Sequence, residues 1–239
     1  MTPNVHPPQT PDRSLEPANH TQSQGKWTWL ISLSAITALL FLGNIFLPKP
    51  KQPLEPVWGV RPAPLVMQGG DPYLRALMRT ISVAESNTER PYSVLYGGDH
   101  IEDLSQHPDR CVTIVSGPNE GNCSTAAGRY QFITTTWQEK ASEYHPEPGG
   151  FWFWRDLEAY NFAPEYQDQV VYRWLDDPQA WGIDLSALLQ QERLEEVLEI
   201  LSPTWTSLGY GIEPNSMTDL LPEVYQQILQ EELANAKSS

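Results

Sequence analysis

The stretch DPYLRALMRTISVAES, residues 71–86, decides how the rest of the chain folds. Its apolar residues recur at the three-and-four spacing of one helical face: Leu74, Leu77, Met78 and Ile81. Asp71 supplies a capping carboxylate before Pro72, which suits the first turn of a helix. The stretch therefore predicts a short amphipathic helix with one buried face.

Glu85 occupies the position at which the next apolar residue of this face is due. At about 100° per residue, it lies within about 20° of Leu74 and Met78 around the helix axis. The helix C-terminus and partial burial both disfavour a carboxylate, so both raise the pKa of Glu85. A general acid that works near neutral pH needs such a raised pKa. The alternative is a frayed helix end from which Glu85 turns to water.

The chain before this helix divides into segments of different composition. Residues 1–26 are rich in Pro, Ser, Thr, Asn and Gln and should be disordered. Residues 27–47 run for 21 residues without a charge, and two tryptophans at one border support a single transmembrane helix. A cleaved signal peptide is the alternative, but the apolar run is long, begins late and lacks a small-residue cleavage site.

A proline-rich spacer, residues 48–68, leads from this segment into a folded domain at residues 69–239. Positive charges on the two sides of the apolar segment are nearly balanced, so charge does not decide its orientation. Cys111 and Cys123 bracket a segment typical of a hairpin, and a disulfide between them would persist only in an oxidising compartment. Two unpaired thiols are the alternative. We expect the domain to lie outside the cytoplasm.

The composition excludes several classes of function. The formal net charge is −15, and the folded domain has no cluster of Lys and Arg, so nucleic acid is not an expected partner. The sequence lacks a glycine-rich phosphate loop and a dinucleotide fingerprint, and no cofactor is expected. A zinc site is disfavoured because no histidine stands at ligand spacing beside either cysteine.

Helical periodicity dominates the chain after the two cysteines, whereas strand signal is confined to residues 92–115. Helices are predicted at residues 134–143, 164–175, 192–201 and 221–233. The fold class is therefore α+β: a predominantly helical domain with a small β-lobe. The aromatic run at residues 151–154 could stack on sugar rings, although core packing is the alternative.

Several short motifs together resemble the phage lambda lysozyme family. They occur in one order and cover nearly all of residues 71–232: VAESNT (83–88), YSVLYGG (92–98), DLSQHP (103–108), TAAGRYQ (125–131), Trp137, APEYQD (163–168), WTSL (205–208) and GYG (209–211). The resemblance implies a lysozyme-like fold. It also implies cleavage of the β-1,4 bond between N-acetylmuramic acid and N-acetylglucosamine in peptidoglycan.

In the resembled family the reaction is a lytic transglycosylation, and the resemblance assigns the acid and base steps to Glu85. Two other functions stay open: a hydrolytic muramidase (lysozyme) on the same scaffold, and an inactive glycan-binding protein of the envelope. Glu85 disfavours the last of these, because a binding module does not need the carboxyl group. The expected location is the outer side of a bacterial cytoplasmic membrane, with peptidoglycan glycan strands as the partner.

The resemblance also places other residues at the substrate-binding cleft: Ser86, Tyr92, Asp103, Tyr130, Gln131 and Tyr210. For Tyr130 and Gln131, packing and capping are the alternatives. Asp103 is equally suited to capping a turn. The sequence departs from the family at Ser86, where the family has glycine, and at Ser93, where it has aspartate. The second departure removes a carboxylate and favours a mechanism with a single acid.

Overall fold

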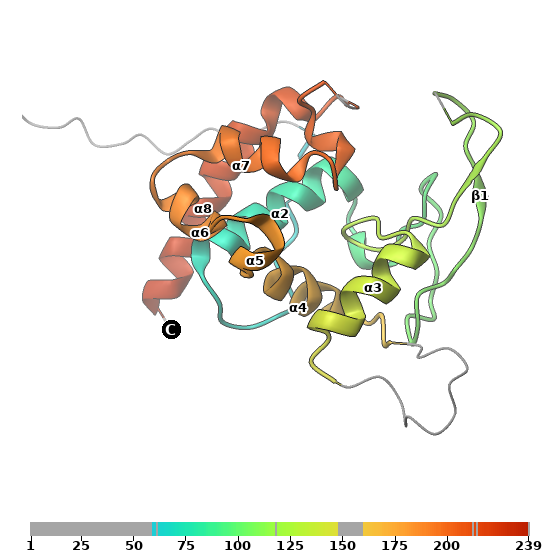
Figure 1. Cartoon of the computed structure of the whole chain (residues 1–239), viewed down its shortest axis with the longest axis horizontal. Helices are drawn as coiled ribbons and strands as arrows, with labels where there is room; N and C mark the ends of the chain where they lie inside the picture. Colours follow the sequence, from blue (N-terminus) through green and yellow to red (C-terminus); the bar gives the residue numbers. More distant parts are fainter. Residues whose placement is uncertain are drawn as a thin grey trace, which may run out of the picture. The chain divides into compact units, whose positions relative to one another are not determined.

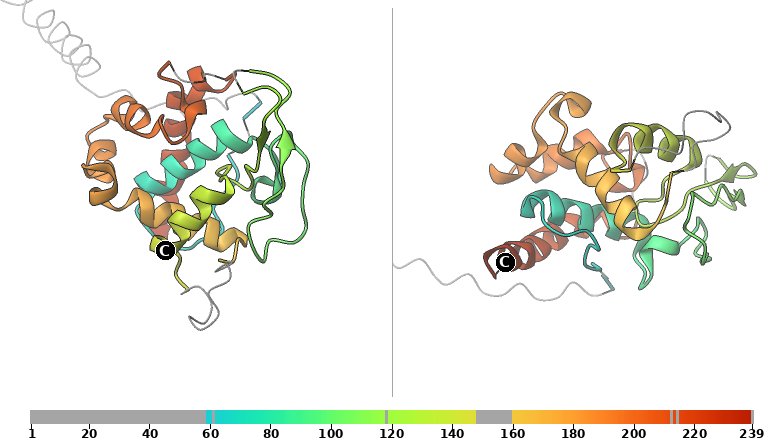
Figure 2. Two further views of the ribbon diagram at one scale, coloured as in Figure 1. Left: turned by 45° about the vertical axis from the view of Figure 1, so that its right-hand side comes forward. Right: turned by 90° about the horizontal axis from the view of Figure 1, so that it is seen from below.

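The computed structural model describes residues 59–60, 62–117, 119–147, 160–211, 213 and 215–238. Helix α2 (Pro72–Ser86) runs through the middle of the helical part (Figures 1 and 2). The carboxylate of Asp71 caps it and accepts hydrogen bonds from the backbone N–H groups of Tyr73 and Leu74 at 2.8 and 3.0 Å. The predicted cap and apolar stripe are confirmed. However, α2 is buried on nearly all sides and not along one face only.

Helices make up most of the remaining described chain. They are α3 (Thr134–Tyr144), α4 (Pro164–Leu175), α5 (Pro178–Trp181), α6 (Leu185–Gln190), α7 (Leu194–Leu201) and α8 (Leu221–Ser238), with 3₁₀ helices η1 (Pro91–Ser93), η2 (Thr206–Leu208) and η3 (Thr218–Leu220). The four helices predicted from periodicity correspond to α3, α4, α7 and α8. Periodicity does not predict α5 and α6, which are too short to show it and begin after the capping aspartates Asp177 and Asp184.

Buried ion pairs join α2 to α8. Arg79 donates to Oε1 of Glu232 at 2.8 Å, and Arg75 donates to Oε2 of the same carboxylate at 2.7 Å. Glu232 is only 4% exposed. Because a buried charge without its partner costs several kcal/mol, these pairs fix α8 along α2. The central helix is thereby held to the C-terminal helix.

The small β-lobe stands apart from the helices in Figure 1. Strands β1 (Val112–Thr113) and β2 (Cys123–Ser124) pair antiparallel, with Val112 opposite Ser124. A disulfide between Cys111 and Cys123 closes this hairpin, as predicted. The expected α+β class, mostly helical with a small sheet, is therefore confirmed.

The folded domain begins before residue 69, the limit expected from composition. Leu65 and Met67 are only 7% and 8% exposed and belong to the hydrophobic core. The predicted disordered tail (1–26), transmembrane helix (27–47) and aromatic run (151–154) lie outside the described residues, as does most of the linker. Among the helices that are described, none has the length and apolar character needed to cross a membrane.

Candidate active site

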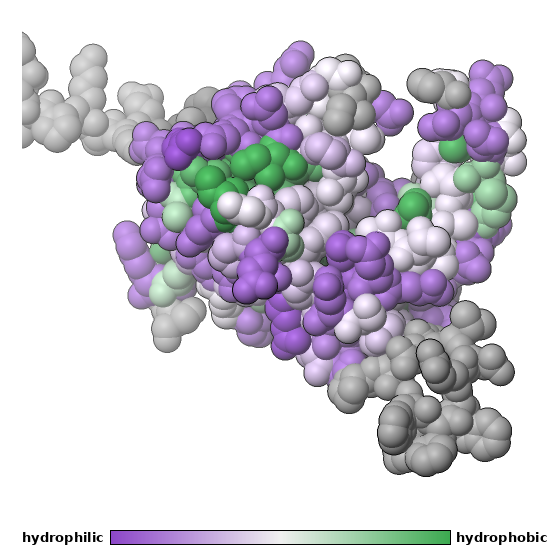
Figure 3. All heavy atoms as spheres, in the orientation of Figure 1, coloured by the Kyte–Doolittle hydropathy of each residue, from purple (hydrophilic) through white to green (hydrophobic). Residues whose placement is uncertain are grey.

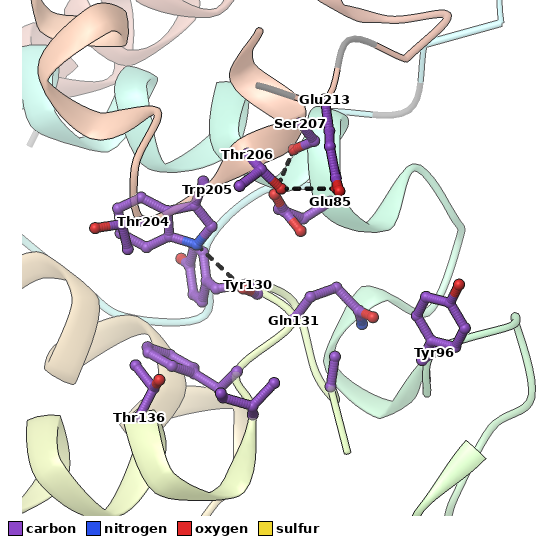
Figure 4. A pocket seen from close by; sticks show the side chains of 13 residues that line it. Glu85, Tyr96, Tyr130, Gln131, Thr136, Thr204, Trp205, Thr206, Ser207 and Glu213 are labelled. Atoms are coloured by element: carbon purple, nitrogen blue, oxygen red, sulfur yellow. Dashed lines mark hydrogen bonds between the residues drawn. The ribbon is translucent and has the colours of Figure 1, made fainter. Parts of the chain in front are cut away.

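Glu85, the predicted acid, lies in the last turn of α2 and faces a cleft of about 360 Å³. The surface is hollowed between the helices and the β-lobe (Figure 3). Figure 4 shows the side chains that line the cleft, which come from segments far apart in the sequence. They are Glu85, Tyr96, Ala126, Tyr130, Gln131, Phe132, Ile133, Thr136, Thr204, Trp205, Thr206, Ser207 and Glu213.

The carboxyl group of Glu85 is suited to exchanging a proton near neutral pH. Burial raises its pKa from the ordinary 4.5 to about 7. The hydroxyl of Ser207 opposes this rise by donating a hydrogen bond to Oε1, and the carboxylate of Glu213 adds to it. Since Oε1 accepts from Ser207, the proton of the acid form sits on Oε2.

Glu213 is a second carboxylate in the cleft, held there by Thr206. Its backbone N–H donates to the carbonyl oxygen of Thr206 at 3.3 Å, and its carboxylate accepts from Thr206 Oγ1 at 3.1 Å. On the same loop, Asn215 donates to the carbonyl oxygen of Ala84 at 2.9 Å, which ties the loop to the end of α2. In Figure 4 Glu85 and Glu213 lie on the same side of the cleft. Within the described ranges no three His, Cys, Asp or Glu side chains group into a possible metal site.

The turn from Gly128 to Gln131 forms another wall of the cleft. Gly128 has a φ of 75°, and a Cβ atom there would collide with the side chains of Gln167 and Phe162. Only glycine fits this position. Gln131 also has a positive φ, 48°, and its Nε2 donates to the carbonyl oxygen of Gly128 at 2.9 Å. The turn is thus braced by its own side chain, and a contact of Gln131 with substrate stays a prediction.

Tyr130 borders the cleft but turns its hydroxyl into the protein. The side chain is 1% exposed, and the hydroxyl donates to Oδ1 of Asp168 at 2.7 Å. Its backbone oxygen accepts from Trp205 Nε1 at 3.1 Å. In this structure Tyr130 therefore supports the wall of the cleft, and its hydroxyl has a partner other than a sugar.

Ser86 and Tyr92, two residues expected at the cleft, lie behind its lining. The hydroxyl of Ser86 donates to the carbonyl oxygen of Arg129 at 2.6 Å, so it ties the end of α2 to the neighbouring turn. The hydroxyl of Tyr92 donates to Oδ2 of Asp168 at 2.7 Å and accepts from Arg129 Nη1 at 2.8 Å. Both side chains position residues of the cleft wall.

Asp103 and Tyr210 lie outside the lining of the cleft as well. Asp103 accepts a hydrogen bond from the backbone N–H of Ser105 at 2.9 Å in an exposed turn, which is the capping alternative. Hydrogen bonding with the side chain of Ser105, and with its backbone N–H, lowers the pKa of Asp103. Tyr210 is 42% exposed, borders a separate hollow beside α7 and donates its hydroxyl to Glu195. Direct contact of either residue with a substrate stays a prediction.

Sequence reasoning did not assign roles to Ser207, Glu213 or Asp168. Ser207 belongs to one of the quoted motifs, but its contact with Glu85 joins residues 122 positions apart. The burial of Asp168 could have been predicted from helical periodicity. It falls in line with the buried residues Val171 and Leu175 of α4, just as Glu85 falls in line with the stripe of α2. Glu213 has no comparable signal, because it lies in a loop.

Comparisons with known proteins identify the family of this chain. A family model described as Endolysin matches residues 75–231. The endolysin of Escherichia phage lambda is 27% identical over 123 residues, a match that covers 50% of this chain and 64% of that protein. This chain thus spans slightly less than two thirds of the length of that curated relative.

Two solved structures of bacteriophage lambda lysozyme are also similar. One, complexed with a chitohexasaccharide, is 23% identical with a TM-score of 0.49 and covers 68% of this chain and 97% of that chain. The other is 20% identical with a TM-score of 0.47, and the match covers 70% of this chain and 97% of that chain. The family model matches well over half of the sequence, which confirms the resemblance drawn from the motifs. The chain belongs to the endolysin family.

Proposed function

We propose that this protein cleaves the glycan strands of peptidoglycan at the β-1,4 bond between N-acetylmuramic acid and N-acetylglucosamine. Membership of the endolysin family supports this reaction class. The observation that carries the proposal is Glu85, a carboxyl group in a cleft with a pKa of about 7. A carboxylic acid with that pKa is about half protonated at neutral pH, so it can both protonate the oxygen of the leaving sugar and act as a base afterwards.

The proposed outcome is a lytic transglycosylation. Glu85 gives its Oε2 proton to the glycosidic oxygen as the bond from that oxygen to C1 of muramic acid breaks. The resulting carboxylate then accepts the proton of the 6-hydroxyl as the 6-oxygen bonds to C1. Glu85 ends in its starting protonation state, and no water is consumed. The product carries a 1,6-anhydro ring.

Hydrolysis is the second candidate, and Glu213 is the observation in its favour. A carboxylate on the same cleft can accept a proton from an attacking water, the role that a second carboxylate has in inverting glycosidases. Thr206 holds Glu213 in place for such a role. The two outcomes differ in the source of the oxygen on the new sugar end.

Digestion in ¹⁸O-labelled water separates the two candidates. Transglycosylation is expected to release anhydro ends without the label, as measured by mass spectrometry of the sugars. Hydrolysis would instead place one labelled oxygen on each new reducing end. Purified peptidoglycan left uncleaved by the full-length protein would contradict both.

We expect the activity to fall as the pH rises above about 7, because Glu85 then loses the proton that the first step requires. Glu213→Gln removes a neighbouring negative charge, which lowers the pKa of Glu85. The alkaline limb of kcat/KM against pH should therefore move to lower pH by up to about one unit. Glu195→Gln is a matched control, since Glu195 borders the separate hollow beside α7. Equal shifts in both variants would contradict the assignment.

We further propose that an N-terminal membrane anchor keeps the domain on the outer side of a bacterial cytoplasmic membrane. The uncharged segment at residues 27–47 and the disulfide support this location. Deleting residues 1–58 should leave turnover of soluble glycan fragments unchanged and weaken digestion of wall in intact cells. Equal digestion of the wall by both proteins would argue against the anchor.

A further inference from the structure

A short segment before α2 is bound to the domain through its backbone. Residues 62–68, called the strap here, contain two prolines, Pro62 and Pro64, and resemble a linker in the sequence. In the structure the side chains of Leu65 and Met67 enter the core, while Val66 is 46% exposed. The strap is thus held mainly by two buried side chains and by its own N–H and carbonyl groups.

Two buried guanidinium groups bind the carbonyl groups of the strap. Arg129, which is fully buried, donates from Nη1 to the oxygen of Pro64 at 2.9 Å and from Nη2 to the oxygen of Ala63. Arg79, 4% exposed, donates to the oxygen of Pro62 at 2.6 Å. Hydrogen bonds from a charged donor inside a protein are about twice as strong as neutral ones.

One buried carboxylate binds the N–H groups of the strap. Oδ2 of Asp168 accepts from the backbone of Val66 at 2.8 Å and from that of Met67 at 3.2 Å. Asp168 has no exposed surface, so these bonds replace the water that its charge would otherwise require. The strap therefore binds two buried cations and one buried anion at the same time.

Arg129 and Asp168 also contact residues at or next to the cleft. The backbone oxygen of Arg129 accepts from Ser86, the residue after Glu85, at 2.6 Å. Oδ1 of Asp168 accepts from the hydroxyl of Tyr130, which lines the cleft, at 2.7 Å. Arg129 and Asp168 therefore each contact both the strap and a residue at or next to the cleft.

We propose that the strap is a positioning segment for the cleavage reaction, and this inference rests on the proposed function. By satisfying Arg129 and Asp168 it fixes the turn from Gly128 to Gln131 relative to Glu85. Without the strap, both buried charges would need new partners, and the turn that depends on them would move. The chain that precedes the domain is then linked directly to the geometry of the cleft.

A pair of substitutions at Val66 tests the strap in the full-length protein. Val66→Pro removes the N–H that donates to Asp168, whereas Val66→Ala keeps it and changes only a partly exposed side chain. Using soluble peptidoglycan fragments, we expect Val66→Pro to lower kcat about tenfold with KM within about twofold of the wild type. Val66→Ala should match the wild type in both.

A second pair keeps the test decisive should Val66→Pro fail to fold. Leu65→Ala loosens the buried anchor of the strap but keeps every backbone hydrogen bond, and should lower kcat about threefold at constant KM. Gln226→Ala, which changes an exposed side chain of α8 outside the strap, should have no effect. A kcat of Leu65→Ala equal to that of Gln226→Ala, or an effect on KM alone, would overturn the positioning role. Failure of the proposed function would look different, because the wild type itself would release no sugar.

Discussion

Glu85→Gln should reduce the release of sugars from peptidoglycan by at least about a thousandfold. General acid catalysis typically contributes about 10² to 10⁴ in rate, and here one carboxyl group serves as acid and then as base. Glutamine keeps the shape of the side chain and can still accept the hydrogen bond from Ser207. It cannot give or take the proton. The measurement is the initial rate of soluble sugar release by the full-length protein and the variant at pH 6.5.

The thermal stability of Glu85→Gln tests whether misfolding causes its loss of activity. The pKa of Glu85 is raised on folding, so the folded state binds the proton more tightly than the unfolded chain between pH 4.5 and about 7. Stability associated with this group is therefore lost as the pH rises through that window. Glu85→Gln should remove this loss and stabilise the domain by up to about 3 kcal/mol at pH 8. An inactive variant with a lower melting temperature than the wild type would contradict this account.

Asp168→Asn should destabilise the domain by about 3 to 5 kcal/mol, the usual cost of removing one member of a buried charge network. The carboxylate accepts hydrogen bonds from two backbone N–H groups and two tyrosine hydroxyls: Val66, Met67, Tyr92 and Tyr130. An amide nitrogen cannot accept, so at least one of these donors loses its partner. Arg129 also loses a nearby negative charge. The melting temperature should fall by roughly 10 °C.

Asp176→Asn is a matched control for this substitution, since Asp176 lies directly after the same helix and is exposed. It should change the melting temperature by no more than about 2 °C, as surface substitutions usually do. Equal changes in the two variants would mean that the buried hydrogen bonds of Asp168 contribute little. The proposed link between the strap and the cleft would then lose its main support.

Local patterns in the sequence were sufficient to predict much of this fold. The spacing of Leu74 and its partners gives the position of α2, and the proline at residue 164 gives the start of α4. The hairpin between Cys111 and Cys123 follows from β-branched residues and a glycine turn. In each case the signal lies within about a dozen residues of the feature that it predicts.

The features that were missed depend on contacts between distant parts of the chain. The strap resembles a free proline-rich linker, because the arginines that bind its carbonyl groups come later in the sequence. Tyr130 was expected at the substrate-binding cleft with packing as the alternative, and the hydrogen bond of its hydroxyl to Asp168 of α4 could not be predicted from either segment alone. Ser207 and Glu213 meet Glu85 only when η2 and the following loop pack against the end of α2. Periodicity does not contain such information.

Mass spectrometry of the sugars released from purified peptidoglycan tests the central claim most directly, with the full-length protein and Glu85→Gln compared side by side. The account predicts fragments whose muramic acid ends are lighter by one water than reducing ends, and no such fragments from the variant. Release of the same anhydro fragments by Glu85→Gln would contradict the role of Glu85. Intact glycan strands after treatment with the wild-type protein would contradict the proposed function as a whole.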